Sequence, residues 1–111
     1  MIVNSDDGFR TTAGSLNNII DPVLGSFSGG RGASDTSFSF FVQEAGIYPL
    51  RTVWAEGGGG ANIEWKYVKP DGTHVLVNDT ANGGPKAYRA LAGGATDSRP
   101  YVSNVYYSIS P

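Results

Sequence analysis

The chain has 111 residues and a mass of 11.7 kDa, enough for one domain with a modest core and too little for a cofactor domain plus a substrate domain. Its 16 Gly and 6 Pro favour turns, and charged residues supply only 16% of the chain. Hydrophobic residues at 40% are too frequent for a disordered chain. We therefore expect one folded all-β domain spanning residues 1–111.

Charge and cysteine content exclude several partners. Eight basic against ten acidic residues give a formal net charge of -2, and no basic cluster is present that could follow a phosphate backbone, so nucleic acid is not expected as a partner. No apolar stretch approaches the roughly 20 residues that cross a bilayer, so no membrane association is expected. Since the chain has no Cys, a bound metal would be held by oxygen ligands.

The first half of the chain contains three predicted strands. Phe9–Thr12 is a short candidate, and a long Gly-rich and Ser-rich connection from Gly14 to Gly32 follows it. Apolar and polar residues then alternate in Ser37–Val42 and again in Ile47–Glu56. The short turn Glu44–Gly46 between these two segments predicts an antiparallel hairpin or a closely neighbouring pair of strands.

Three more strands are predicted in the second half. Ala61–Tyr67 alternates regularly and is expected to be half-buried. The turn Lys69–Thr73 contains Pro, Asp and Gly in the order of a tight turn and leads into Thr73–Val77, while Tyr101–Ile109 is the expected closing strand. Short antiparallel strands joined by Gly-rich connections predict an antiparallel β-sandwich or jelly roll.

Candidate catalytic groups are few. His74 is the single His and is expected to face solvent from its strand, so a Ser/His/acid triad would depend on it alone. The run Gly57–Gly60 lacks the Lys-Ser/Thr of a phosphate-binding loop and precedes a strand, which argues against nucleotide binding. A glycoside hydrolase would need two facing carboxylates, whereas the acids are scattered along the chain. We therefore expect no enzymatic activity.

Candidate binding residues form one acidic pair and a few scattered groups. Asp6 and Asp7, in Asn4–Gly8, have two interpretations: an Asx turn in which Gly8 takes a positive φ, or a Ca²⁺ site built from carboxylate, amide and carbonyl oxygens. Trp54 and Trp65 fall on apolar faces and are expected in the core, whereas exposed Tyr rings could stack on sugars. The further ligand candidates are Arg31, Asn62, Tyr88 and Tyr106.

Three motifs in order resemble the second half of the domain named after anthrax protective antigen. They are Asn4–Arg10, Ala45–Arg51 and Trp54–Trp65, and the similarity extends over residues 3–68. The resemblance implies a β-sandwich from a secreted bacterial protein. In the adhesin branch of this family, two adjacent Asp joined by a cis peptide bond hold a Ca²⁺ that binds sugar hydroxyls, and Asp6 and Asp7 match that pair.

These observations lead to one functional expectation and one rival. We expect a non-catalytic carbohydrate-binding module of a larger secreted protein, with a polysaccharide or glycan as partner and Ca²⁺ as cofactor at Asp6 and Asp7. The rival is a structural or adhesion spacer domain that has no sugar site. The N-terminal strands of the family domain have no counterpart here, so the chain is either a minimal form or has an open sheet edge, covered by its C-terminal strand or by a second copy in a homo-oligomer.

Overall fold

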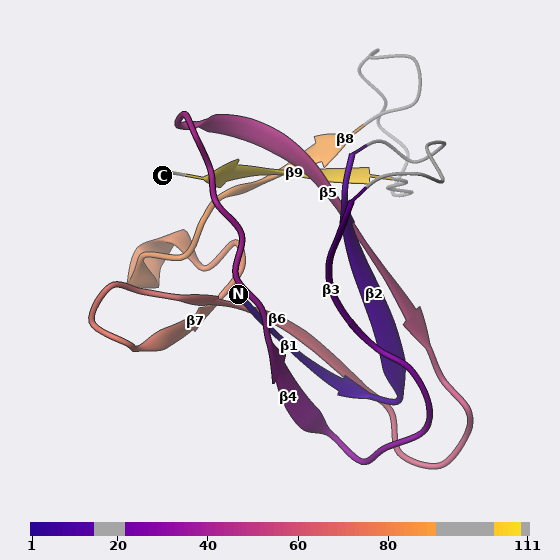
Figure 1. Cartoon of the computed structure of the whole chain (residues 1–111). Helices are drawn as coiled ribbons and strands as arrows, with labels where there is room; N and C mark the ends of the chain where they lie inside the picture. The colour runs from indigo at the N-terminus through magenta and orange to yellow at the C-terminus, as the bar shows by residue number, and fades with distance from the viewer. Residues whose placement is uncertain (15–21, 91–103, 110–111) are drawn as a thin grey trace.

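Nine β-strands in two antiparallel sheets form the part of the chain that the computed structural model describes, residues 1–14, 22–90 and 104–109 (Figure 1). The strands are β1 (Ile2–Asp6), β2 (Gly8–Ala13), β3 (Val23–Phe27), β4 (Ser34–Ser37), β5 (Gly46–Ala55), β6 (Asn62–Val68), β7 (His74–Leu76), β8 (Ala87–Ala90) and β9 (Asn104–Ile109). One sheet has the order β4-β1-β6-β7 and the other β3-β2-β5-β9-β8. The predicted all-β antiparallel sandwich is confirmed. A short 3-10 helix, η1 (Thr80–Asn82), follows β7.

β1 is a strand that the sequence prediction missed, and it lies inside the four-stranded sheet between β4 and β6. Its Val3 and Ser5 side chains are fully buried. Asp7 then connects β1 directly to β2 in the other sheet, so consecutive strands belong to different layers. The expected positive φ at Gly8 is wrong: Gly8 begins β2 with a φ outside the left-handed region, and a Cβ there would lie 3.0 Å from the carbonyl oxygen of Phe27. Gly8 therefore allows β2 and β3 to approach closely.

The predicted strand Ser37–Val42 and its hairpin with the next strand are wrong. The strand that forms in this region is β4, Ser34–Ser37, and residues 38–42 are not part of a strand. They carry the chain from one sheet to the other, since β4 and β5 lie in different layers. The alternation is real all the same: Phe38 and Phe40 are partly buried, Val42 is buried, and Phe41 is 87% exposed. Period-two burial here comes from an extended crossing segment without a neighbouring strand.

Two further strands lie in segments predicted as connections. β3 lies within the Gly14–Gly32 segment, and β8 contains Tyr88. The other predictions are confirmed: β5, β6 and β7 form as expected, and in the turn before β7 the backbone N–H of Thr73 donates to Asp71 Oδ1 (2.9 Å). β9 lies between β5 and β8, so the C-terminal strand covers β5, as one alternative required. Residues 101–103 of the expected closing strand lie outside the described residues.

The buried apolar core between the sheets is small. Its members within the described residues are Ile2, Val3, Phe9, Val42 and Leu50. Thr11 is also fully buried, and its hydroxyl bonds that of Thr52 (2.7 Å) across β2 and β5. Because few of the described apolar side chains are fully buried, polar contacts near the ends of the sheets carry a larger share of the stability among the residues described.

Candidate functional site

Three connections meet at one end of the sandwich, the lower end in Figure 1: β1–β2, β3–β4 and β5–β6. The Asp7 side chain joins all three. Its Oδ1 accepts a hydrogen bond from the backbone N–H of Arg31 in the β3–β4 loop (2.9 Å), and its Oδ2 accepts one from the N–H of Gly57 in the β5–β6 loop (2.7 Å). Asp7 is therefore oriented by contacts to residues distant in the sequence.

Asp7 belongs to a cluster of three carboxylates with Asp6 and Glu56. One oxygen from each lies within 4.8 Å of the others. Asp6 and Asp7 are half-buried and are joined by a cis peptide bond, while Glu56 is exposed and accepts a hydrogen bond from the N–H of Gly58 (2.6 Å). The sequence prediction missed Glu56. Its signal was positional: it follows Ala55, and Ala55 pairs with Gly8, next to Asp7.

The electrostatics of the two Asp residues differ. The pKa of Asp6 is raised by its partial removal from water, by the charges of Asp7 and Glu56, and by a hydrogen bond with the Asp7 side chain. The pKa of Asp7 is lowered because the N–H groups of Arg31 and Gly57 bond its ionised form. Two adjacent carboxylates are thus held in different ionisation environments. A cation would relieve their mutual repulsion, and three oxygen ligands suit a hard ion such as Ca²⁺.

Glycines allow the loops to reach these carboxylates. A Cβ at Gly57 would lie 2.9 Å from Asp7 Oδ2, and one at Gly60 would lie 3.2 Å from Asp6 Oδ2. Gly32, by contrast, has open space around the position of a Cβ. The glycine run before β6 therefore brings backbone close to acidic side chains, a close approach that side chains would obstruct.

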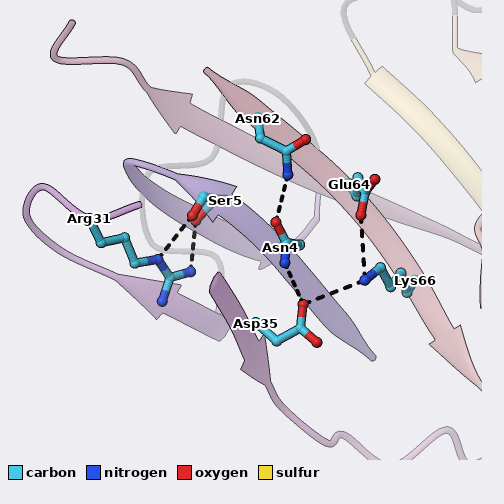
Figure 2. Close-up of polar contacts among 7 residues, drawn as sticks. All are labelled: Asn4, Ser5, Arg31, Asp35, Asn62, Glu64 and Lys66. Atoms are coloured by element: carbon cyan, nitrogen blue, oxygen red, sulfur yellow. Dashed lines mark hydrogen bonds and ion pairs between the residues drawn. The ribbon is translucent and has the colours of Figure 1, made fainter. Parts of the chain in front are cut away.

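Arg31, predicted as a ligand residue, has its guanidinium directed at other residues of the protein. Nε donates to the carbonyl of Ser5 (3.1 Å), Nη2 to the Ser5 hydroxyl (2.8 Å) and Nη1 to Thr36 Oγ1 (2.9 Å). Figure 2 shows the two contacts with Ser5. The guanidinium carbon also lies 4.0 Å from the centre of the Phe27 ring, a cation–π contact. The Ser5 hydroxyl donates in turn to the carbonyl of Asp7 (2.7 Å). Arg31 therefore stabilises the connection at Asp7 through Ser5.

Asn62 lies beside the carboxylate cluster because it pairs with Asp6 across β1 and β6. Its side-chain amide donates to Asn4 Oδ1 (2.6 Å), and Asn4 Nδ2 donates to Asp35 Oδ1 (2.7 Å). Lys66 completes the row with ion pairs to Asp35 (3.5 Å) and Glu64 (3.4 Å) (Figure 2). This polar row crosses the outer face of the four-stranded sheet from β6 to β4.

The polar row predicts a pH-dependent stability. The hydrogen bond from Asn4 and the nearby charges of Lys66 and His74 lower the pKa of Asp35. An Asp with a folded pKa below its unfolded value stabilises the fold above about pH 4 and loses that contribution as the pH falls through the lowered pKa. Asp35→Asn should therefore have a lower free energy of unfolding than wild type at pH 7. Because Asp35 is exposed, the difference should be less than about 1 kcal/mol, and it should vanish in strong acid.

Urea unfolding of both proteins between pH 7 and pH 2 measures this difference. Added salt should shrink the Lys66 contribution and leave the bond from Asn4 in place. A stability difference that grows toward acid would contradict the assignment.

Tyr88 and Tyr106 lie far from the carboxylates. They pair with each other across β8 and β9, and Tyr106 pairs with Pro49 on β5. Pro49 is six residues from Ala55, about 20 Å along an extended strand. Tyr88 is 36% exposed, with Lys86 Nζ 5.0 Å from its ring centre. The structure therefore brings Asp6, Asp7 and Asn62 together but leaves the tyrosines at another part of the five-stranded sheet.

Trp54 corrects the core prediction. Trp65 is partly buried and packs against the core as expected, but Trp54 remains 36% exposed. Its indole N–H donates to the carbonyl of Asp6 (2.9 Å), which places an accessible ring beside the carboxylate cluster. The alternation of residues in β5 correctly predicted that Trp54 points to the inner face of its sheet. It could not show that this inner face is accessible to solvent at the end of the sandwich. His74 is exposed on β7, as predicted.

An open groove of about 610 Å³ lies next to the carboxylates. We call it the loop-end groove. It is formed by the first part of β2, the end of β3 with the loop after it, and the end of β5. Its lining includes Asp7, Arg10, Ser26, Gly30, Val53 and Glu56. Two of the three clustered carboxylates thus border a hollow large enough for a small ligand.

Comparisons with protein-family models, with curated proteins and with solved structures found no match to this chain. Within residues 1–14, 22–90 and 104–109, no helix has the length and apolar character needed to cross a membrane.

Proposed function

We propose that this chain is a non-catalytic carbohydrate-binding module of a secreted protein, which binds polysaccharide in the loop-end groove with Ca²⁺ held by Asp6, Asp7 and Glu56. One observation carries the proposal: three carboxylates, from the end of β1, the β1–β2 connection and the β5–β6 loop, form one cluster, and two of them line an open groove. Ca²⁺ takes six to eight oxygen ligands, so three carboxylates leave positions for carbonyl, water and sugar oxygens.

The surrounding residues have distinct parts in this proposal. The N–H groups of Arg31 and Gly57 orient Asp7 before any ligand arrives. Such preorganisation reduces the entropy cost of binding. Trp54 is not part of the groove lining, but its exposed ring lies beside Asp6 and offers a flat apolar surface on which a sugar bound at the cluster could stack. Bound Ca²⁺ would supply the positive charge that attracts hydroxyl oxygens.

The spacing of the acids favours binding over hydrolysis. Glycosidases hold two carboxyl groups about 5 to 10 Å apart, on either side of the bond that they cleave. Here the three carboxylates form one cluster with oxygens within 4.8 Å, as ligands of a single ion would. His74, the only imidazole, lies on β7 in the other sheet from the groove strands.

The alternative function is a structural or adhesion spacer that contacts protein. The edges of the two sheets favour it. Among the strands that the structure describes, β4 and β7 are the edge strands of one sheet and β3 and β8 those of the other, and pairing through such edges would give a homo-oligomer. The exposure of the Trp54 ring beside Asp6 favours the sugar-binding proposal, because a spacer has no need of an accessible ring there. Size-exclusion chromatography with light scattering would test edge pairing.

Affinity gel electrophoresis tests the main proposal. The protein is run through gels that contain plant or microbial polysaccharides, with Ca²⁺ or with a chelator. We expect retardation on at least one polysaccharide with Ca²⁺, and weaker retardation with the chelator. The absence of retardation on every polysaccharide under both conditions would reject the proposal.

Gly57→Ala should weaken Ca²⁺ binding while the sheets stay intact. The added Cβ would approach Asp7 Oδ2 to 2.9 Å, so the carboxylate must move away from the N–H that orients it. The loss of one charge-assisted hydrogen bond weakens binding by roughly tenfold. Isothermal titration with CaCl₂ measures the affinity. Gly32→Ala is the matched control, because its Cβ would enter open space, and equal affinities for the two variants would contradict the proposed geometry.

A further inference from the structure

Arg10 lies in the loop-end groove and is separate from the carboxylate cluster. It is the third residue of β2 and pairs with Val53 on β5 and Ser26 on β3. Its neighbours in sequence, Phe9 and Thr11, are buried, whereas Arg10 is exposed. Because side chains alternate along a strand, Arg10 faces outward, and it lines the groove together with Val53 and Ser26.

The guanidinium of Arg10 makes no hydrogen bond or ion pair with any residue that the structure describes. The contrast with Arg31 is direct: Arg31 also lies near the groove but gives Nε, Nη1 and Nη2 to Ser5 and Thr36. Arg10 is thus the available cation of the groove lining. A guanidinium presents a planar fork of N–H donors that matches a carboxylate in a bidentate pair.

The two ends of the groove carry opposite charge. Arg10 is two residues along β2 from Gly8, a rise of about 7 Å, and the Asp7 carboxylate lies on the far side of Gly8. A glycan that carries a carboxylate could pair it with Arg10, the cationic side chain of the groove lining, about 7 Å or more along the groove from the acidic end where the proposed Ca²⁺ would bind hydroxyls. Its hydroxyls would then reach the acidic end, while Val53, 48% exposed, contacts the apolar face of a sugar ring.

We infer that the groove takes an acidic glycan, a polyuronate, and that Arg10 binds a carboxylate of that ligand. This inference rests on the proposed carbohydrate-binding function and narrows it to one class of ligand. The observations that carry it are the outward placement of Arg10, its position in the groove lining, and the lack of a hydrogen bond or ion pair from its guanidinium to any residue that the structure describes.

The test compares charged and neutral polysaccharides in affinity gels at 150 mM NaCl. The charged set is polygalacturonate, alginate and hyaluronan; the neutral set is dextran, galactan and fully methyl-esterified polygalacturonate. We expect retardation by a polyuronate and none by the neutral set. Arg10→Gln should weaken polyuronate binding at least about tenfold, as expected for the loss of a bidentate pair. Its melting temperature should stay that of wild type, because the side chain has no described partner.

Lys69→Gln is the matched control, since it removes the same charge at the turn after β6, outside the groove. It should bind polyuronate like wild type. Equal binding by Arg10→Gln and wild type, or an equal loss in Lys69→Gln, overturns the inference. Retardation by neutral polysaccharides alone also overturns it and leaves the carbohydrate-binding function standing, whereas no retardation on any polysaccharide rejects both.

Discussion

The proposed Ca²⁺ site predicts that Ca²⁺ stabilises the folded protein and that Asp7→Asn abolishes this stabilisation. A ligand that binds only the folded state at 100 times its Kd stabilises by about 2.7 kcal/mol, which for a domain of this size raises Tm by roughly 10 to 20 °C. Asp7 is the carboxylate that two backbone N–H groups orient, and it supplies one of the three clustered oxygens. Asn in its place has no negative charge for the ion.

Thermal melting with and without CaCl₂ measures this effect, and two further variants make it specific. Glu56→Gln removes an exposed carboxylate of the cluster and should also reduce the Ca²⁺ response without disturbing the fold. Asp35→Asn makes the same chemical change on β4, outside the cluster, and should retain the full response. If wild type does not respond to Ca²⁺, the cation has no place in the proposed function. If Asp7→Asn responds fully, the ion binds elsewhere.

Arg31→Ala should be the most destabilising of the substitutions considered. Ser5 is fully buried, and the guanidinium bonds both its hydroxyl and its carbonyl. Removing a donor from a buried polar group costs about 1 to 3 kcal/mol for each group left without a partner. The cation–π contact with Phe27 is lost as well. We expect a loss of about 3 kcal/mol in the free energy of unfolding.

Urea unfolding followed by Trp fluorescence measures this loss. Arg31→Lys should recover only part of it, because an ammonium cannot bond Ser5 and Thr36 with the geometry of the guanidinium. Arg10→Ala is the matched control, and as an exposed substitution it should stay within about 0.5 kcal/mol of wild type. A loss below about 1 kcal/mol in Arg31→Ala would show that water replaces the guanidinium without cost.

Strands with regular alternation could be predicted, because burial of one face leaves a period of two in the sequence. This holds for β5 and β6, and the turn before β7 was marked by Pro, Asp and Gly. β4, with the sequence Ser-Asp-Thr-Ser, contains no apolar residue. It is held to β1 by backbone pairing and by the bond from Asn4 to Asp35. A polar edge strand of this kind has no hydrophobic pattern to detect.

β1 shows why long-range contacts limit prediction. Asn4, Ser5 and Asp6 are typical turn residues, and together with Gly8 they predicted a turn. Ser5 is buried because Arg31, 26 residues later, satisfies its polar groups. For the same reason the pair Asp6 and Asp7 could be identified from the sequence, but not Glu56, which joins them only through the pairing of β2 with β5. Propensity describes the segment alone, while tertiary partners decide the outcome.

The passage of the chain from β1 straight into β2 has a mechanical consequence. Asp7 lies where the chain passes from one sheet to the other. Its side chain binds the β3–β4 loop and the β5–β6 loop, and each of these loops also runs from a strand of the five-stranded sheet to a strand of the four-stranded sheet. A load applied to a ligand held there is shared by strands of both layers. Pulling such a ligand off and separating the two sheets would therefore load the same contacts, the hydrogen bonds of Asp7 to Arg31 and Gly57.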